Sequence, residues 1–224
     1  DGNGDGAMRR TEATILLSLA VVGVIAAFWL VVISPKRDEA ASLKQDIESV
    51  DSKREKLIAE TREILKKSKG AIYSLQRGDN KEAQKALGEL KPKIDALKPY
   101  SEDANYASVT KPPIQEYVEA ACFSEFISTG KILPRKEIGV SAENYIAGLC
   151  DLSGEIVRKA VNAAINDDSK TVISAKKFIE NLYYELMQFD FRNGELRRKF
   201  DGIKYDLKKM EDLLLSLKLQ GKIK

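Results

Sequence analysis

A run of 21 residues without a charged side chain, from Ala13 to Ile33, constrains this chain more than any other feature of its sequence. At about 1.5 Å of rise per residue, a helix of this length spans the ~30 Å hydrocarbon core of a bilayer. The core helix of a soluble protein would normally carry a polar face, and this run has none. The sequence therefore predicts a single transmembrane helix over residues 13–34.

The predicted span divides the chain into unequal parts. We expect a flexible, acidic and glycine-rich tail over residues 1–12, the transmembrane helix over 13–34, a juxtamembrane linker helix over 35–44 and a helical domain over 45–224. More lysine and arginine side chains flank the C-terminal side of the span than the N-terminal side, which favours a cytoplasmic helical domain. A cleaved signal peptide is one alternative. A fused segment that is foreign to a cytoplasmic domain is the other.

The N-terminal tail has the spacing of a twelve-residue calcium loop. Asp1, Asn3, Asp5 and Glu12 stand at ligand positions of the pattern D-x-N-x-D-G-x5-E. No second loop exists in the sequence to pair with it. A Ca²⁺ site is therefore the weaker interpretation of this tail, and a flexible terminus or a cloning remnant is the stronger one.

A second segment, Ile114 to Thr129, predicts a helix in the interior of the folded domain. Prolines precede it and a glycine follows it, and these residues bracket about four helical turns. Its side chains are apolar or aromatic on every side of the helix, apart from a few acids. Glu116 and Glu119 are three residues apart and share one face. Two carboxylates on an interior helix are costly unless a proton, a basic partner or a metal ion neutralises them.

Asp151 and Glu155 repeat this arrangement on another largely apolar helix, where they stand four residues apart. If the two helices pack side by side, the four carboxylates converge and form a hard-oxygen site suited to Mg²⁺ or Mn²⁺. Arg158 and Lys159 lie within one turn of Glu155. An ion pair inside the helix is therefore the alternative to a metal site.

The absence of histidine excludes whole classes of active site. It removes serine–histidine and cysteine–histidine nucleophiles as well as histidine-ligated zinc. Cys122 and Cys150 sit in apolar segments, and two cysteines cannot build a four-thiolate site. No glycine-rich phosphate-binding loop is present. Any catalysis by this chain must therefore depend on carboxylates and a hard metal ion.

The C-terminal segment is basic, since residues 192–224 hold ten lysines and arginines and five acids. Such a segment predicts contact with nucleic-acid phosphates, although a solvated helix face has the same composition. The candidate nucleic-acid-binding residues are Arg192, Arg197, Arg198, Lys199, Lys204 and Lys208.

An apolar pattern runs through the same segment with alternating spacings of four and three. This spacing is typical of a narrow helix-packing seam. The seam packs either inside the bundle or against a second copy of the chain, and the second arrangement predicts a homo-oligomer. It consists of Leu196, Phe200, Ile203, Leu207, Met210, Leu214 and Leu217.

The rest of the chain completes an all-α fold, a bundle of about six or seven helices preceded by the transmembrane helix. Turn residues at 78–80 and 166–168 separate helix-prone segments, and Ser141 is placed to cap a helix that ends near Ile165. Pro92 predicts the end of a helix or a kink. Residues 99–113 predict a long loop beside the acids.

Three motifs occur in order along the chain: Q-E-Y-V-E-A followed by F-x-x-F-I, then Y-I-A-G-L-C-D-L-S-G-E, then L-R-R-K-F-D-G-I-K-Y-D-L-K-K-M-E. Together they resemble the translin family, in the branch of translin-associated factor X and its archaeal relatives. The resemblance covers roughly residues 45–224 and implies a helical fold, ring- or barrel-like oligomers and binding of single-stranded RNA or DNA. It also implies that Glu116, Glu119 and Asp151 hold the Mg²⁺ of an endoribonuclease, with Glu155 as a neighbouring catalytic residue.

We therefore expect a Mg²⁺-dependent (or Mn²⁺-dependent) endoribonuclease that acts on single-stranded RNA and is anchored through residues 13–34. This span departs from the translin family, whose members are typically soluble. One alternative is a non-catalytic, nucleic-acid-binding translin homologue in which the acids are structural. The other is a membrane-anchored helical protein that serves as an assembly or interaction platform.

Overall fold

Every regular element in the described part of the chain is an α-helix, which confirms the predicted all-α fold. The computed structural model describes residues 4–223, with side chains described for residues 14–31 and 38–223. The chain forms two compact units, residues 1–53 and 54–224. The helices are α1 (Gly4–Arg77), α2 (Asn80–Ser101), α3 (Ala107–Thr129), α4 (Arg135–Ile138), α5 (Ala142–Ile165), α6 (Ser169–Leu186) and α7 (Glu195–Leu219).

The predicted transmembrane segment lies within α1. The window Thr14–Val31 is long and apolar enough to cross a membrane, and none of it is buried in the described protein. The proposed calcium-loop residues Asp1, Asn3, Asp5 and Glu12 lie outside the residues whose side chains the structure describes.

Side-chain caps explain where the bundle helices begin. Ser141 accepts a hydrogen bond from the backbone N–H of Asn144 (3.4 Å) at the start of α5. Asp168 accepts one from the backbone N–H of Thr171 (3.1 Å) at the start of α6. These caps confirm the positions at which the sequence predicts both helices to begin. Pro92 does not end α2, which continues through it.

The prediction of a long loop over residues 99–113 is wrong. α2 and α3 extend into it from both sides and leave only residues 102–106 outside the two helices. Thr110 anchors the first turn of α3, because its hydroxyl donates to the carbonyl oxygens of Tyr100 (3.2 Å) and Tyr106 (2.9 Å). The two tyrosine rings also meet edge to face, with centroids 5.7 Å apart. This network stabilises a helical turn ahead of the prolines, which lack the N–H that a helix normally uses.

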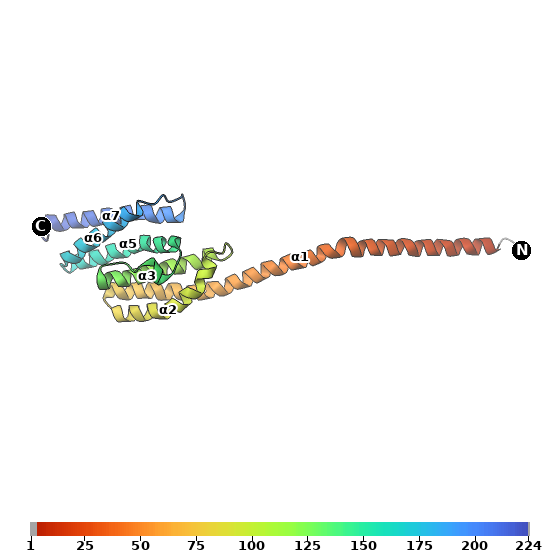
Figure 1. Cartoon of the computed structure of the whole chain (residues 1–224), viewed down its shortest axis with the longest axis horizontal. Coiled ribbons are helices and arrows are strands. Elements are labelled where there is room, and N and C mark those ends of the chain that lie inside the picture. Colours follow the sequence, from red (N-terminus) through yellow and green to blue (C-terminus); the bar gives the residue numbers. More distant parts are fainter. Residues whose placement is uncertain (1–3, 224) are drawn as a thin grey trace. The chain divides into compact units, whose positions relative to one another are not determined.

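Helix α5 is central to the bundle (Figure 1). It contacts α3, α6 and α7, and α3 in turn contacts α2. Phe123 of α3 and Leu152 and Ile156 of α5 are fully shielded from solvent. The prediction that residues 114–129 form an interior helix is confirmed, since most of this segment is buried.

The apolar seam of α7 packs within the bundle of the same chain. Phe200, Ile203, Met210 and Leu217 are buried in the common core. Phe200 also stacks on Tyr183 of α6, with ring centroids 5.3 Å apart. These four seam residues therefore face the chain's own interior, as the first of the two arrangements predicts.

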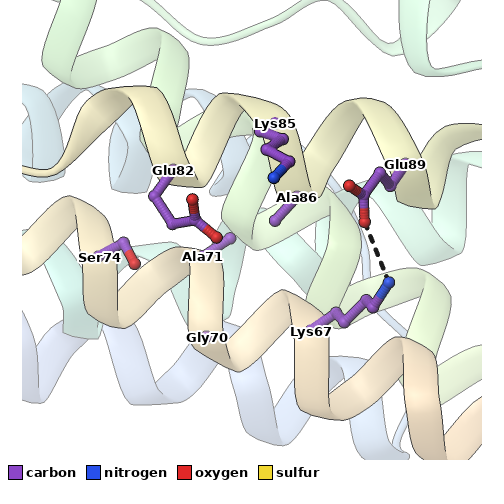
Figure 2. A pocket seen from close by; sticks show the side chains of 8 residues that line it. All are labelled: Lys67, Gly70, Ala71, Ser74, Glu82, Lys85, Ala86 and Glu89. Carbon is purple, nitrogen blue, oxygen red and sulfur yellow. Dashed lines mark hydrogen bonds and ion pairs between the residues drawn. The ribbon is translucent and has the colours of Figure 1, made fainter.

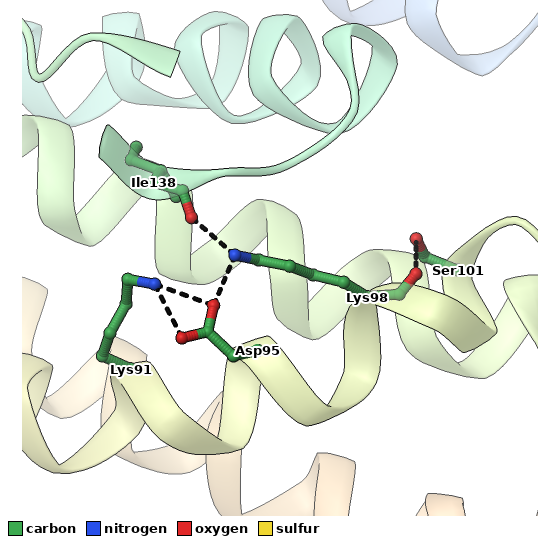
Figure 3. Close-up of polar contacts among 5 residues, drawn as sticks. All are labelled: Lys91, Asp95, Lys98, Ser101 and Ile138. Carbon is green, nitrogen blue, oxygen red and sulfur yellow. Dashed lines mark hydrogen bonds and ion pairs between the residues drawn. The ribbon is translucent and has the colours of Figure 1, made fainter. Parts of the chain in front are cut away.

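The connector between α3 and α5 is fastened to α2 by Lys98 (Figure 3). The Lys98 ammonium donates to the carbonyl oxygen of Ile138 (2.7 Å) and pairs with Asp95, which also accepts from Lys91 (2.7 Å). Gly139 follows with a φ of 73°, and a Cβ there would lie 2.9 Å from Lys98 Nζ. Glycine suits this position because of its positive φ, whereas the flexible Lys98 side chain could move to admit a Cβ. The contact fixes the connector just ahead of α5.

Candidate functional site: carboxylates between α3 and α5

Four carboxylates lie near one another where α3 contacts α5. Glu116 and Glu119 belong to α3, and Asp151 and Glu155 belong to α5. Glu119 lies close enough to the other three for each negative charge to act on its carboxyl group. The structure therefore places the four predicted acids in one group, which we call the acid cluster.

A glycine allows the two helices to approach each other at the acid cluster. A Cβ on Gly148 of α5 would lie 2.7 Å from the Val118 Cβ of α3 and 2.8 Å from the carbonyl oxygen of Gln115. Real Cβ atoms do not come this close to such neighbours, so only glycine fits without a shift of backbone. Val118 directly precedes Glu119, and Gly148 lies three residues before Asp151. This close contact between the two helices is therefore next to the acids.

Glu119 is the buried member of the acid cluster. It is 8% exposed, and among the described residues it has no hydrogen-bond or ion-pair partner. Burial, followed by the negative charges of Glu116, Asp151 and Glu155, raises its pKa to about 8, while Lys199 opposes the effect. Glu119 therefore keeps its proton at neutral pH unless a cation is bound.

Glu116 is half-buried and lies one turn before Glu119. Burial raises the pKa of Glu116 above its ordinary value. The positive charges of Lys69 and Lys199 act against this rise, whereas the negative charge of Asp151 adds to it. Glu116 and Glu119 are therefore both harder to ionise than acids in solvent.

The acids of α5 each have a partner from another helix. Lys199 of α7 donates to Asp151 and forms an ion pair with it. The Gln76 amide of α1 donates to the Glu155 carboxylate (2.7 Å) and to the Glu155 backbone carbonyl (2.8 Å). Arg158 also approaches Glu155 at 3.6 Å. The intrahelical ion pair considered from the sequence therefore forms, but Gln76 makes the shorter contact.

The acid cluster has the chemistry of a hard-cation site. It offers carboxylate oxygens from two helices, one of them on a buried acid without a partner, and Mg²⁺ and Mn²⁺ prefer such ligands. In the part of the chain that the structure describes, no three acidic or cysteine side chains already converge closely enough to hold a metal ion. Asp151 and Glu155 are engaged by Lys199 and Gln76 instead. A cation would therefore have to compete with these partners.

Sequence reasoning did not predict the contacts of Lys199 and Gln76 with the acids of α5. The sequence predicts Lys199 on a phosphate-contacting surface, whereas its ammonium lies at Asp151. Gln76 is 79 residues from Glu155 along the chain, and no motif marks it. These contacts arise only because α1 and α7 pack against α5 in the folded domain.

The other predicted nucleic-acid-binding residues lie in α7 or just before it. Arg197 pairs with Asp201 (3.1 Å) and lies over the Phe200 ring, with its guanidinium carbon 5.8 Å from the centroid. Those that are exposed to solvent are Arg192, Arg198, Lys204 and Lys208. They are accessible to a polyanion.

A second polar surface lies between α1 and α2 (Figure 2). We call it the α1–α2 groove; its volume is about 300 Å³, and Lys67 pairs across it with Glu89 at 3.1 Å. Its charges are mixed in sign and open to solvent. It is lined by Lys67, Gly70, Ala71, Ser74, Glu82, Lys85, Ala86 and Glu89.

Comparison with known proteins gives one family. The model of the translin family matches residues 52–221. An uncharacterized protein of Methanocaldococcus jannaschii is 34% identical and covers 73% of this chain and 76% of its own length. The translin-associated protein X homolog of Schizosaccharomyces pombe is 26% identical over 80% of this chain and 87% of its own length.

Solved structures show the same similarity. The crystal structure of apo-NeC3PO has a TM-score of 0.72 and 28% identity, and the match covers 79% of this chain and 95% of that one. The structure of AfC3PO in complex with duplex RNA has a TM-score of 0.71 and 25% identity, over 81% of this chain and 97% of that one.

Proposed function

This chain belongs to the translin family, and we propose that its helical domain binds RNA and cleaves it with a divalent cation held by the acid cluster. The observation that carries the proposal is Glu119, which is 8% exposed and faces three further carboxylates. Burying an acid without a partner destabilises a fold, and a bound cation offsets that cost. This balance is typical of a binding site and is unusual for a purely structural acid.

Each acid has a role that follows from its position. Glu116, Glu119 and Asp151 would hold Mg²⁺ or Mn²⁺, and Glu155 would orient the attacking water or accept its proton. When bound, the cation supplies Lewis-acid stabilisation of the charge that develops on the scissile phosphate. Gln76 fixes the Glu155 carboxylate in one orientation through its 2.7 Å hydrogen bond.

The RNA substrate is supported by the relatives and by charge. AfC3PO was solved in complex with duplex RNA, whereas the family resemblance of the sequence motifs implies a single strand. The exposed basic residues of the C-terminal segment supply contacts to phosphates of either form. We expect RNA affinity to fall steeply with rising salt. Charge reversal at Arg197 and Arg198 together should weaken binding to all sequences alike.

The test is cleavage of end-labelled RNA, single-stranded and duplex in parallel, with Mg²⁺ and with excess chelator. The proposal expects products only with a divalent cation, and it expects Mg²⁺ alone to raise the unfolding temperature. RNA binding without cleavage at any Mg²⁺ concentration would instead support the non-catalytic alternative. Undiminished cleavage in chelator would rule out the carboxylate mechanism.

We further propose that residues 13–34 anchor this domain to a membrane from the cytoplasmic side. In support, the window Thr14–Val31 has no buried residue in the described protein, and so large an apolar surface is costly in water. Membrane fractionation of the full chain tests the anchor. The chain should sediment with membranes and require detergent, whereas recovery in the soluble fraction would indicate a cytoplasmic protein.

We also infer that the domain forms homo-oligomers, through surfaces other than the buried part of the α7 seam. Large apolar side chains on or near α6 and α7 remain exposed in the single chain, and such side chains are typical of protein interfaces. Light scattering of the detergent-solubilised chain measures the subunit number, and a monomer would contradict the inference. The exposed side chains are Tyr184, Met187, Phe189, Tyr205, Leu215 and Leu219.

A further inference from the structure

Lys199 stands between the acid cluster and a small cavity. Its ammonium pairs with Asp151, and its side chain is 22% exposed. The same residue lines a cavity of about 90 Å³ together with Lys111 and Gln115. Gln115 directly precedes Glu116, so the cavity adjoins the acids. Lys199 therefore contributes to both places.

The positive charge of Lys199 partly balances the negative charges of the acids on α3 and α5. It pairs with Asp151 directly, and its charge lowers the pKa of both Glu116 and Glu119. An ammonium and a divalent cation repel each other, and both compete for the same carboxylate. A cation that takes Asp151 as a ligand must therefore weaken the hold of Asp151 on Lys199.

The adjoining cavity is polar and could receive the released ammonium. The Gln115 amide donates to the Asn144 side-chain oxygen at 3.2 Å, which fixes Gln115 against α5. Asn144 is completely buried, and its side-chain nitrogen has no partner among the described residues. Lys111 lines the same cavity and is held by Glu143 at 2.9 Å. The ammonium groups of Lys111 and Lys199 suit a phosphate group of a polyanion, while Glu143, which Lys111 already neutralises, and Glu195 also line the cavity.

We propose that Lys199 couples cation binding to RNA binding. In the protein without a cation it neutralises Asp151; when a divalent cation replaces it there, the ammonium becomes a ligand for an RNA phosphate at the adjoining cavity. This inference rests on the proposed function, because it requires a cation at the acid cluster. Lys199 thus exchanges Asp151 for an RNA phosphate when the cation binds. The cation and the RNA therefore bind cooperatively.

The experiment compares the wild-type chain with Lys199→Met and with Lys67→Met as a matched control. Both substitutions remove one positive charge from an interhelical ion pair, but Lys67 pairs with Glu89 in the α1–α2 groove. Mg²⁺ affinity is measured by calorimetry without RNA. RNA affinity is measured with and without Mg²⁺ on a phosphorothioate RNA that a denaturing gel shows to remain intact. Thermal unfolding checks that each variant is folded.

In the wild type we expect Mg²⁺ to raise RNA affinity by about tenfold, within the usual range of coupling between two ligands. Lys199→Met should bind Mg²⁺ more tightly than the wild type, because the competing ammonium is gone, and should lose most of this Mg²⁺-dependent gain. Lys67→Met should keep both wild-type values. Lys199→Arg, which retains the charge, should recover part of the gain.

Two outcomes separate this inference from the proposed function. A wild-type chain that neither binds Mg²⁺ nor cleaves RNA overturns both. A wild-type chain that cleaves RNA with Mg²⁺, beside a Lys199→Met variant with unchanged Mg²⁺ affinity and unchanged coupling, overturns the role of Lys199 alone. Weaker Mg²⁺ binding in a folded Lys199→Met variant also overturns it.

Discussion

The α3–α5 contact and the α1–α2 groove both place glutamates where two helices meet, yet the two regions shift the pKa of the carboxyl group in opposite directions. In the groove, the hydrogen bond from Lys67 lowers the pKa of Glu89. Nearby, hydrogen bonds from Lys93 and Lys67 lower the pKa of Glu63. Between α3 and α5, burial and neighbouring acids raise the pKa of Glu119 to about 8.

This difference separates acids that are paired with lysines from a buried acid that has no such partner. Glu89 and Glu63 face solvent and lie beside lysines, so they ionise readily at little cost. Glu119 is shielded from solvent, lies among like charges and has no basic partner in the described chain. Its environment disfavours the ionised form until a cation arrives, which is the condition expected of a cation ligand.

The largest expected effect is on catalysis. Glu119→Gln keeps the size of the side chain but removes its negative charge. We expect Mg²⁺-dependent RNA cleavage to fall by about 10²-fold or more, the scale for loss of one group that stabilises transition-state charge. Glu89→Gln makes the same chemical change in the groove and should leave the rate unchanged. The rates are measured with end-labelled RNA. Equal rates for the two variants would show that Glu119 matters no more for cleavage than Glu89 does.

The second prediction concerns stability and pH without a cation. The unfolded chain releases the Glu119 proton near pH 4.5, whereas the folded chain keeps it to about pH 8. The free energy of unfolding of the wild type should therefore fall as pH rises through this window, relative to Glu119→Gln. We expect the two proteins to be alike near pH 4 and the variant to be more stable by on the order of 3 kcal/mol at pH 8.

Denaturant unfolding in chelator at several pH values measures this difference. Adding Mg²⁺ at pH 8 should reduce it, since the cation stabilises only the wild-type acid cluster fully. A difference that does not change with pH would show that Glu119 titrates like an acid in solvent.

Local signals in the sequence are sufficient for much of this fold. Ser141 caps α5 through the N–H three residues on, and the spacing of Glu116 and Glu119 places both acids on one face. Such features depend on neighbours within about one helical turn. They could therefore be read without knowing how the helices pack.

Features that depend on distant contacts could not be predicted in this way. Lys199 reaches Asp151 from 48 residues away, and both its charge and its place in a basic segment favoured a solvent-facing position. The start of α3 depends on the hydroxyl of Thr110 and the carbonyl of Tyr100, a contact across two helices. In the sequence alone, Pro112 and Pro113 are the stronger signal, and they favour a helix that begins near residue 114.

The third prediction tests the close approach that builds the acid cluster. Gly148→Ala places a Cβ 2.7 Å from the Val118 Cβ and so forces α3 and α5 apart. We expect a loss of about 1–3 kcal/mol in the free energy of unfolding, as for overpacking elsewhere. Gly88→Ala in α2 is the control, because a Cβ there meets nothing within 4 Å. It should be neutral or stabilising by up to ~1 kcal/mol. Parallel urea titrations measure both, and equal stabilities would show that the helices are not in tight contact at Gly148.

The smallest expected effect is in the α1–α2 groove. Glu89→Gln breaks the 3.1 Å pair with Lys67, but both side chains are exposed, so solvent and salt already screen the attraction. We expect no measurable change in the midpoint of thermal unfolding at physiological salt, and at most a slight decrease at low salt. A loss as large as that of Gly148→Ala would mean that the groove also contributes to the packing of the domain. Its charges would then stabilise the fold, as the contact between α3 and α5 does. Solvent exposure alone would no longer explain why the pKa of glutamate is lowered in one region and raised in the other.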